Sequence, residues 1–183
     1  MTCHQHCAPE VIASRRSFIA GVACSAIVPG AAFAQLSGPG SDVDVRFMRM
    51  AIEEARQGDF PFGAVIVRDG AVIARGRNLG RTTKDPTAHG EMVAIRRCLA
   101  DHGPDALRGS TLYTSGESCA MCMGAIIWCH MGRLVFAASI AQLATKIDQI
   151  MVTDADIAAK AQFAPISITG GVLADEAMAL FTK

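Results

Sequence analysis

Residues 117–128 read ESCAMCMGAIIW and place two cysteines, Cys119 and Cys122, three positions apart at the start of a helix-forming run. One helical turn separates them, so both sulfurs can face the same point. Unpaired N–H groups in the first turn of a helix favour thiolate over thiol. The stretch therefore predicts a pair of metal ligands or a redox pair, and a metal site would need a third ligand from elsewhere.

A third ligand is predicted from residues 85–97, DPTAHGEMVAIRR, where His89 precedes Glu91 by two positions. Zinc prefers thiolate and imidazole, and three protein ligands leave one coordination position for water, as in catalytic zinc sites. His89, Cys119 and Cys122 would form that set, with one Zn²⁺ per chain. Glu91 would lie beside the ion without binding it and would carry protons during the reaction.

Alternating helix and strand patterns flank both motifs and predict an α/β fold with a mixed sheet. Asp69-Gly70 between the first two strand patterns is typical of a two-residue hairpin turn. We expect helices over residues 43–57, 87–99, 154–162 and 173–181 and from 119 onward, and strands over 63–67, 71–74, 111–114, 133–139 and 166–169.

The N-terminal segment, residues 1–34, has the pattern of an export signal. Residues 14–19, SRRSFI, resemble a twin-arginine signal and precede a short apolar run that ends in Ala32-Phe33-Ala34. Pro29 interrupts this run, which is shorter than a membrane-spanning helix needs. We expect cleavage after Ala34, a periplasmic location for a domain of residues 35–183, and no stable membrane association after cleavage.

Charge and cysteine content narrow the functional classes. The 183-residue chain has 17 basic and 17 acidic side chains, so it lacks the strong positive field typical of nucleic-acid binding. Cys98 and Cys129 are expected to be small buried residues rather than ligands. In an oxidising compartment Cys119 and Cys122 would also suit a thiol oxidoreductase, and this alternative stays open.

The combination of HGE at residues 89–91 with CAMC at 119–122 resembles the signature of the zinc-dependent cytidine deaminase-like superfamily. The strings PFGAVIV, GRN, DPTAHGE, LYTS and MCMGAIIW follow the order seen in bacterial guanine deaminases and tRNA adenosine deaminases. The resemblance covers about residues 43–139 and implies a three-layer α/β/α fold with about five strands. The family usually has proline before the first cysteine and often after it, whereas this chain has Ser118 and Ala120.

The same resemblance implies hydrolytic deamination of a nucleobase or nucleoside by a homodimer. It implies substrate contacts at four positions: Asn78, Phe62, Ala88 and Asp148. A turn asparagine and a core phenylalanine are the structural alternatives for the first two. Trp128 is expected in the core or in a contact between subunits.

Guanine is the favoured substrate among free bases and nucleosides because of PFGAVIV and DPTAHGE. The neutral charge and the expected export make tRNA an unfavoured partner. A tRNA adenosine deaminase and a cytosine or adenine deaminase remain alternatives within the class. A periplasmic thiol oxidoreductase that uses Cys119 and Cys122 is the alternative from another class.

Overall fold

The computed structural model describes residues 35–36 and 40–181. The expected export signal, residues 1–34, lies outside these residues. In chain order the elements are β1 (Gln35–Leu36), α1 (Asp42–Arg56), β2 (Gly63–Arg68), β3 (Ala71–Arg77), α2 (Gly90–His102), a 3₁₀ turn (Pro104–Ala106), β4 (Thr111–Gly116), α3 (Ala120–Trp128), β5 (Arg133–Ala138), α4 (Ile140–Leu143), α5 (Asp154–Lys160), β6 (Ser167–Thr169) and α6 (Ala174–Met178).

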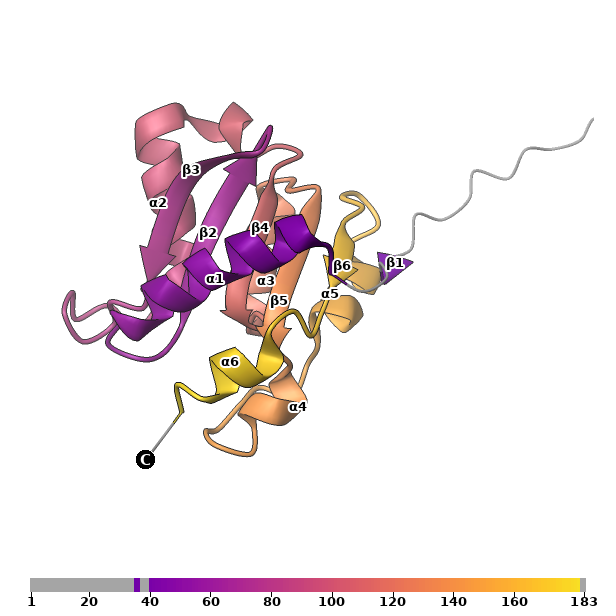
Figure 1. Ribbon diagram of the computed structural model, residues 1–183. Helices are drawn as coiled ribbons and strands as arrows, with labels where there is room; N and C mark the ends of the chain where they lie inside the picture. The colour runs from indigo at the N-terminus through magenta and orange to yellow at the C-terminus, as the bar shows by residue number, and fades with distance from the viewer. Residues whose placement is uncertain (1–34, 37–39, 182–183) are drawn as a thin grey trace, which may run out of the picture. The chain divides into compact units, whose positions relative to one another are not determined.

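The strands form one mixed sheet in the order β1-β6-β5-β4-β2-β3 (Figure 1). Strand β2 runs antiparallel to both β3 and β4, whereas β4, β5, β6 and β1 are mutually parallel neighbours. The five predicted strands are thus confirmed, and the two-residue β1 extends the sheet beside β6. Parallel neighbours require crossover connections, and α3 supplies the one between β4 and β5.

Both faces of the sheet are covered, which gives the three expected layers. Along β2, Ala64 and Ile66 face a core built with α2, α3 and α5. Val65 and Val67 face a second core built with α1, α4 and α6. Because successive side chains of a strand point to opposite faces, a continuous apolar strand such as β2 belongs in the middle of such a fold.

The predicted hairpin between β2 and β3 is confirmed. Asp69 and Gly70 have φ values of 51° and 76°, so both turn residues occupy the left-handed region that a type I′ turn requires. Ile66 pairs with Ala74 and the next residue, Val67, pairs with Val72, so β3 contains one extra residue, Ile73, which indicates a bulge in β3. Glycine at position 70 adopts its positive φ without steric cost.

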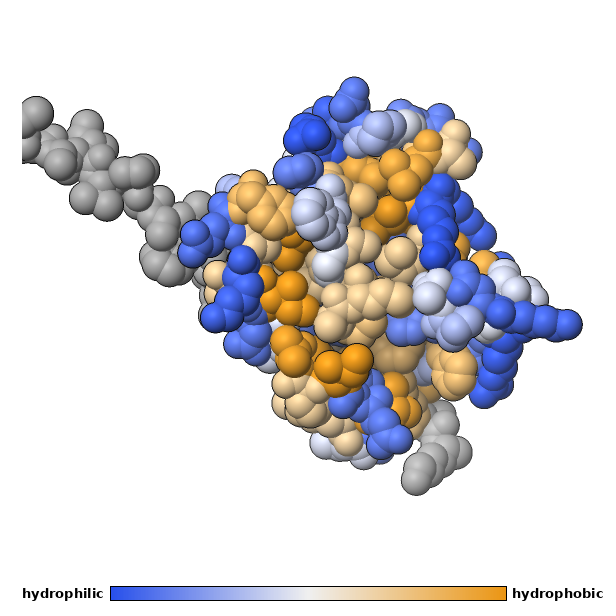
Figure 2. All heavy atoms as spheres, turned by 180° about the vertical axis from the view of Figure 1, so that it is seen from behind, coloured by the Kyte–Doolittle hydropathy of each residue, from blue (hydrophilic) through white to orange (hydrophobic). Residues whose placement is uncertain are grey.

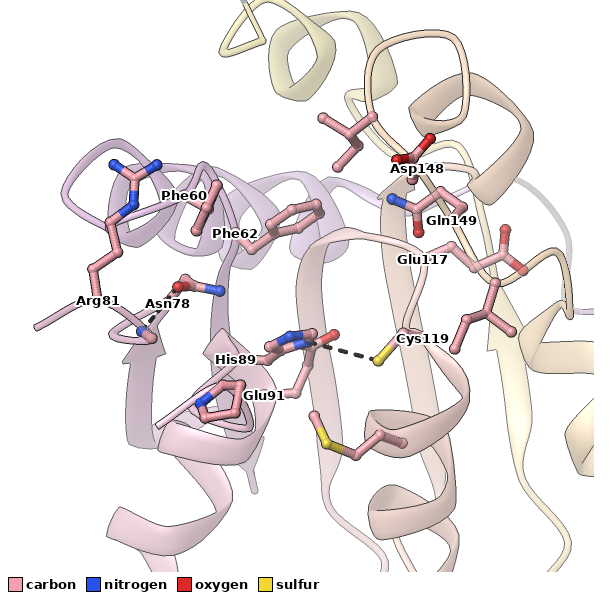
Figure 3. Close-up of a pocket in the computed structure, with 15 residues that line it drawn as sticks. Phe60, Phe62, Asn78, Arg81, His89, Glu91, Glu117, Cys119, Asp148 and Gln149 are labelled. Atoms are coloured by element: carbon pink, nitrogen blue, oxygen red, sulfur yellow. Dashed lines mark hydrogen bonds between the residues drawn. The ribbon is translucent and has the colours of Figure 1, made fainter. Parts of the chain in front are cut away.

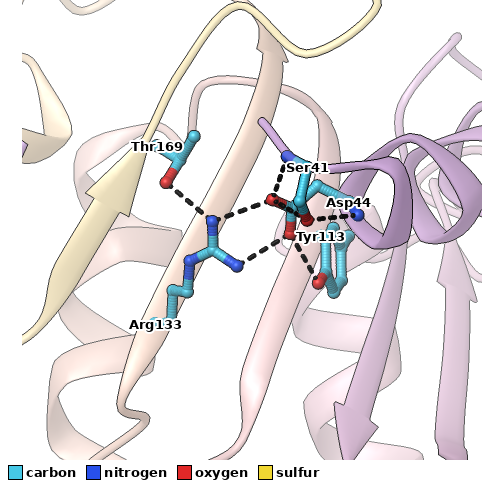
Figure 4. A network of polar contacts seen from close by, with 5 residues as sticks. All are labelled: Ser41, Asp44, Tyr113, Arg133 and Thr169. Carbon is cyan, nitrogen blue, oxygen red and sulfur yellow. Dashed lines mark hydrogen bonds and ion pairs between the residues drawn. The ribbon is translucent and has the colours of Figure 1, made fainter. Parts of the chain in front are cut away.

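A buried polar network ties α1 to the sheet (Figure 4). The Asp44 carboxylate accepts two hydrogen bonds from the Arg133 guanidinium, at 2.7 and 3.0 Å, and one from the Tyr113 hydroxyl at 2.9 Å. It also accepts from the Ser41 N–H and hydroxyl, which form the N-terminal capping box of α1. Arg133 donates further to the Thr169 hydroxyl, so one carboxylate joins α1, β4, β5 and β6.

Several local expectations need correction. Helix α2 begins at Gly90 rather than near residue 87, and α6 is shorter than expected. The 3₁₀ turn and α4 were not expected. Cys98 is buried in the core, as predicted, whereas Cys129 is only partly buried and packs against the same core; both are free thiols.

Trp128 is not a core residue. Its exposed fraction is 72%, and its ring packs against Phe163 at a centroid distance of 4.9 Å.

Figure 2 shows hydrophobic side chains gathered over the face opposite to the view of Figure 1. Among the described residues, no helix is long and apolar enough to cross a membrane.

Candidate active site

The three predicted metal ligands lie at the starts of two neighbouring helices. His89 is the N-cap residue of α2 and Cys119 is the N-cap residue of α3, both with extended backbone conformation. Cys122 lies in the first turn of α3 and is fully buried. Neither cap residue uses its side chain to bind helix N–H groups, so the imidazole and the thiol remain available as ligands.

The ligand atoms form a nearly equilateral triangle. The His89 Nδ1 atom lies 3.6 Å from the Cys119 sulfur (Figure 3). It lies 3.7 Å from the Cys122 sulfur, and the two sulfurs are 3.7 Å apart. Tetrahedral zinc, with sulfur at about 2.3 Å and nitrogen at about 2.0 Å, holds its ligand atoms roughly 3.5–3.8 Å apart. The donor types and the spacing therefore both fit one zinc ion.

The electrostatics of the two thiols also suit a cation. Hydrogen bonding with Cys122 lowers the pKa of Cys119 to about 4, and the neighbouring His89 acts in the same direction. The same contact between the sulfurs, together with burial, raises the pKa of Cys122. A raised pKa keeps Cys122 protonated beside the charged Cys119, and a bound divalent ion would favour the thiolate form of both residues.

Glu91 lies in the first turn of α2, beside the ligand triangle (Figure 3). Its exposed fraction is 4%, and it lines the same cavity as His89 and Cys119. Burial raises the pKa of the Glu91 carboxyl, and the negative charge of Cys119 acts in the same direction. A carboxyl group with a raised pKa next to a metal site is suited to accept and return a proton.

These residues open into a cavity of about 670 Å³. Two aromatic side chains, Phe60 and Phe62, lie on one wall, and the loop between α4 and α5 forms the opposite wall (Figure 3). The residues that line it are Phe60, Phe62, Asn78, Gly80, Arg81, Pro86, His89, Glu91, Glu117, Cys119, Met121, Ile147, Asp148, Gln149 and Ile150.

Asn78 lies directly after β3 and is buried at the cavity wall. Its Oδ1 atom accepts a hydrogen bond from the Gly80 N–H at 3.1 Å. This contact orients the side chain so that its amide nitrogen points into the cavity (Figure 3). Asn78 can therefore offer a hydrogen-bond donor to a bound molecule.

The ring of Phe62 is fixed from two sides. Phe181, after α6, packs against it edge-on at a centroid distance of 5.4 Å. On β4, a Cβ atom at Gly116 would come within 2.9 Å of the Phe62 ring, so only glycine leaves the ring this position. Phe62 thus belongs both to the cavity wall and to the edge of the core.

The structure brings Asp148 but not Ala88 to the cavity surface. Asp148 follows α4 and is exposed at the cavity mouth. Ala88 is buried, its carbonyl accepts from the Leu79 N–H, and it is not among the lining residues. The predicted substrate contacts of both residues remain predictions.

Three of the lining residues that were not predicted lie close in the sequence to predicted ones. Glu117 stands two positions before Cys119, and Phe60 stands two positions before Phe62. The guanidinium of Arg81 lies 4.5 Å from the centre of the Phe60 ring, a cation–π contact at the cavity rim. Arg81 lies three positions after Asn78 and eight before His89, but proximity in the sequence does not show that its side chain faces the cavity.

Residues 41–138 match the cytidine and deoxycytidylate deaminase zinc-binding region. The chain belongs to this deaminase family. The match includes all three predicted ligands and Glu91. The zinc-binding deaminase domain thus agrees with the ligand triangle and with the fold.

Relatives of this deaminase domain include enzymes that act on different substrates. The guanine deaminase of Bacillus subtilis (strain 168) is 51% identical over 78 residues, which cover 43% of this chain and 50% of the relative. The tRNA-specific adenosine deaminase of Haemophilus influenzae (strain ATCC 51907) is 42% identical over 104 residues, covering 54% of this chain and 60% of the relative. The chain thus spans about half to three fifths of these relatives.

A solved structure supports the fold assignment. NE0047 in complex with 2,6-diaminopurine superposes with a TM-score of 0.65 and 27% sequence identity. The superposition covers 75% of this chain and 79% of that one. The similarity therefore extends beyond the zinc-binding region to most of the described residues.

Proposed function

We propose that the chain is a zinc-dependent hydrolase that removes the exocyclic amine of a nucleobase or nucleoside, with guanine as the favoured substrate. Such an enzyme acts on a carbon–nitrogen bond of a cyclic amidine and releases ammonia. The observation that carries the proposal is the triangle of His89, Cys119 and Cys122 beside the buried Glu91, at the floor of an aromatic-walled cavity. That combination supplies a metal, a proton carrier and a surface for a flat ring.

In this mechanism the ion held by the three ligands would polarise a water molecule and lower its pKa. Glu91 would take a proton from the attacking water and deliver it to the ring nitrogen next to the amine-bearing carbon. It would then take the remaining proton of the added hydroxyl group and deliver it to the departing amine. One C–O bond forms, one C–N bond breaks, and one water is consumed for each ammonia released.

Recognition of a purine would use groups on opposite walls. The Asn78 amide nitrogen points into the cavity and would donate to an acceptor on the base. The Asp148 carboxylate lies on the other wall and would accept from N–H groups of guanine. Phe62 would provide an apolar surface for the ring. The 51% identity to a guanine deaminase also favours this substrate.

A tRNA substrate is the second candidate, supported by the similarity to tRNA-specific adenosine deaminases. The basic side chains of the β2–β3 hairpin argue against it. Arg75 and Arg77 both lie 3.8 Å from the Glu54 carboxylate, so an acidic group already offsets their charge. A polyanion binds best where several cations are free to contact phosphates.

A substrate panel tests the proposed function. Ammonia release is measured from guanine, adenine, cytosine and their nucleosides, and inosine formation is measured in tRNA at two salt concentrations. We expect guanine to give the largest kcat/KM and tRNA to give no salt-dependent reaction. Activity on tRNA alone would replace guanine with the second candidate.

Metal analysis tests the thiol oxidoreductase alternative. We expect one zinc per chain and the same number of reactive thiols with and without reductant. A zinc-free protein whose Cys119 and Cys122 form a disulfide would instead support the redox function.

We also propose that residues 1–34 are an export signal and that the protein forms a homodimer. N-terminal sequencing of the periplasmic protein should begin at Gln35 if residues 1–34 are removed.

The exposed Trp128 and Phe163 pair favours a contact between two copies on this face. Light scattering should give a dimer for the wild type and a monomer for Trp128→Arg, whereas a monomeric wild type would contradict it.

A further inference from the structure

One wall of the cavity is a loop with little secondary structure of its own. Residues 144–153 connect α4 to α5, and four of them, Ile147 to Ile150, line the cavity. The backbone hydrogen bonds of this loop are local, such as Ile147 N–H to Leu143 and Val152 N–H to Ile150. The position of this wall therefore depends on how its two ends are held.

A single carboxylate holds both ends. Glu117 follows β4 and is buried. Its Oε2 atom accepts from the N–H of Ile140, the first residue of α4, at 2.8 Å. Its Oε1 atom accepts from the N–H of Asp154, the first residue of α5, at 3.1 Å. Each N–H belongs to a helix start with no partner inside the helix, so a charged acceptor binds it well.

A third buried hydrogen bond closes the arrangement. The Asp154 side chain is fully buried, and its Oδ2 atom accepts from the N–H of Ser118 at 3.1 Å. Ser118 immediately precedes the ligand Cys119. A proline at position 118 would have no N–H to donate. The three bonds thus link the ends of the loop to the turn that presents Cys119.

We propose that Glu117 is a positioning residue that holds the 144–153 wall of the substrate cavity against the metal-binding turn. Both carboxylate oxygens are occupied by helix N–H groups, so Glu117 acts through the wall rather than through contact with the substrate. The wall carries Asp148, so its position sets how well the substrate is bound. The effect on catalysis rests on the proposed function, whereas the effect on the loop does not.

The test compares Glu117→Gln with the wild type. An amide has one oxygen acceptor, and its NH₂ group cannot accept from an N–H, so one end of the wall is released. In substrate-free protein, amide hydrogen exchange in residues 144–153 should become about tenfold faster, equal to about 1.4 kcal/mol. Zinc content should stay at one per chain. With guanine, KM should rise about tenfold while kcat stays within about twofold, as expected for a change in binding.

A matched control distinguishes the effect of the Glu117 hydrogen bonds from the effect of ordinary helix capping. Asp156 also lies at the start of α5, and its exposed carboxylate accepts from the Thr153 N–H and hydroxyl. Asp156→Asn makes the same chemical change at the same helix and should leave exchange in residues 147–150 within about twofold. Equal acceleration in both variants would overturn the proposal.

A second variant keeps the proposal testable if Glu117→Gln does not fold. Ser118→Pro removes the N–H that Asp154 accepts, together with the Ser118 hydroxyl, and leaves the Glu117 side chain unchanged, so exchange in the same loop should accelerate by about threefold. Unchanged exchange in the folded variants, or zinc loss without faster exchange, would contradict the proposed role. A protein that deaminates no base but shows the predicted exchange would refute the function alone.

Discussion

Asp44 and Glu91 are both buried carboxylates near the start of a helix, yet their pKa values shift in opposite directions. Burial alone would raise the pKa of Asp44, but hydrogen bonds from Arg133, Ser41 and Tyr113 lower it to about 2. For Glu91 burial dominates and the pKa rises. The two residues are 2% and 4% exposed, so solvent exposure does not distinguish them, and the hydrogen-bond donors around Asp44 account for its lowered pKa.

The opposite pKa shifts distinguish a carboxylate that stabilises the fold, Asp44, from one that can transfer protons, Glu91. Asp44 has fixed donors around both oxygens and stays charged, which links α1 to three strands. Within the part of the chain that the structure describes, Glu91 forms no ion pair with an arginine, and it lines the cavity, so it can gain and lose a proton. Substitutions of the two residues should therefore affect different measurements.

The largest expected effect is on turnover. Glu91→Gln keeps the size of the side chain but removes the proton carrier, so ammonia release should fall by roughly 10²- to 10⁴-fold. Zinc content and the urea-unfolding midpoint should not change, because Glu91 is neither a ligand nor part of a stabilising ion pair. A Glu91→Gln variant that retains more than about a tenth of wild-type activity would show that Glu91 is not the proton carrier.

Asp44→Asn should lower the stability of the protein and leave its activity nearly unchanged. The amide cannot satisfy the Arg133 guanidinium, which remains partly buried without its counter-charge, and this costs about 3 kcal/mol or more of unfolding free energy. Activity of the folded fraction at low temperature should stay near that of the wild type. Urea unfolding measures the loss, with Glu176→Gln as control, since the exposed ion pair of Glu176 with Arg49 contributes about 1 kcal/mol or less.

The pH dependence of the unfolding free energy tests whether Asp44 is charged in the folded protein. The pKa of Asp44 is about 2 in the folded protein and 3.8 ordinarily, so its charged form stabilises the folded state above pH 3.8. This contribution, roughly 2 kcal/mol, is lost as the pH falls from 3.8 toward 2. The difference in unfolding free energy between the wild type and Asp44→Asn should therefore shrink over this range. A constant difference would show that Asp44 is not charged in the folded protein.

The smallest effect concerns the cap of α1. Ser41→Ala removes one hydroxyl donor to Asp44 and the cap of the Asp44 N–H, at a cost of about 1 kcal/mol. Tyr113 and Arg133 still bind the carboxylate, so the loss should stay well below that of Asp44→Asn. Equal losses in the two variants, measured by urea unfolding, would show that the network fails as a unit.

The sequence predicted the features that depend on local patterns. Asp69-Gly70 specifies its turn by backbone conformation alone, and the continuous apolar run of β2 specifies a strand with two buried faces. The start of α2 was placed too early, because His89 is extended and acts as the N-cap. Helix α4 is only four residues long and depends on its capping box and on Glu117, a residue 23 positions away.

The site was predictable where ligand chemistry fixes residue spacing. His89, Glu91, Cys119 and Cys122 carry their signal in two short motifs, and the structure brings them together. The cavity wall was not predictable, since Glu117, Arg81 and Gln149 meet only through the tertiary fold. Trp128 shows the same limit, because an apolar helical pattern does not reveal which face remains uncovered.

Zinc K-edge X-ray absorption of the purified protein tests the central claim most directly. The account predicts one zinc per chain with two sulfur neighbours at about 2.3 Å and two nitrogen or oxygen neighbours at about 2.0 Å, one from His89 and one from water. Cys122→Ser should remove one sulfur neighbour. A zinc-free protein, or an ion surrounded by four protein ligands with no position for water, would contradict the account.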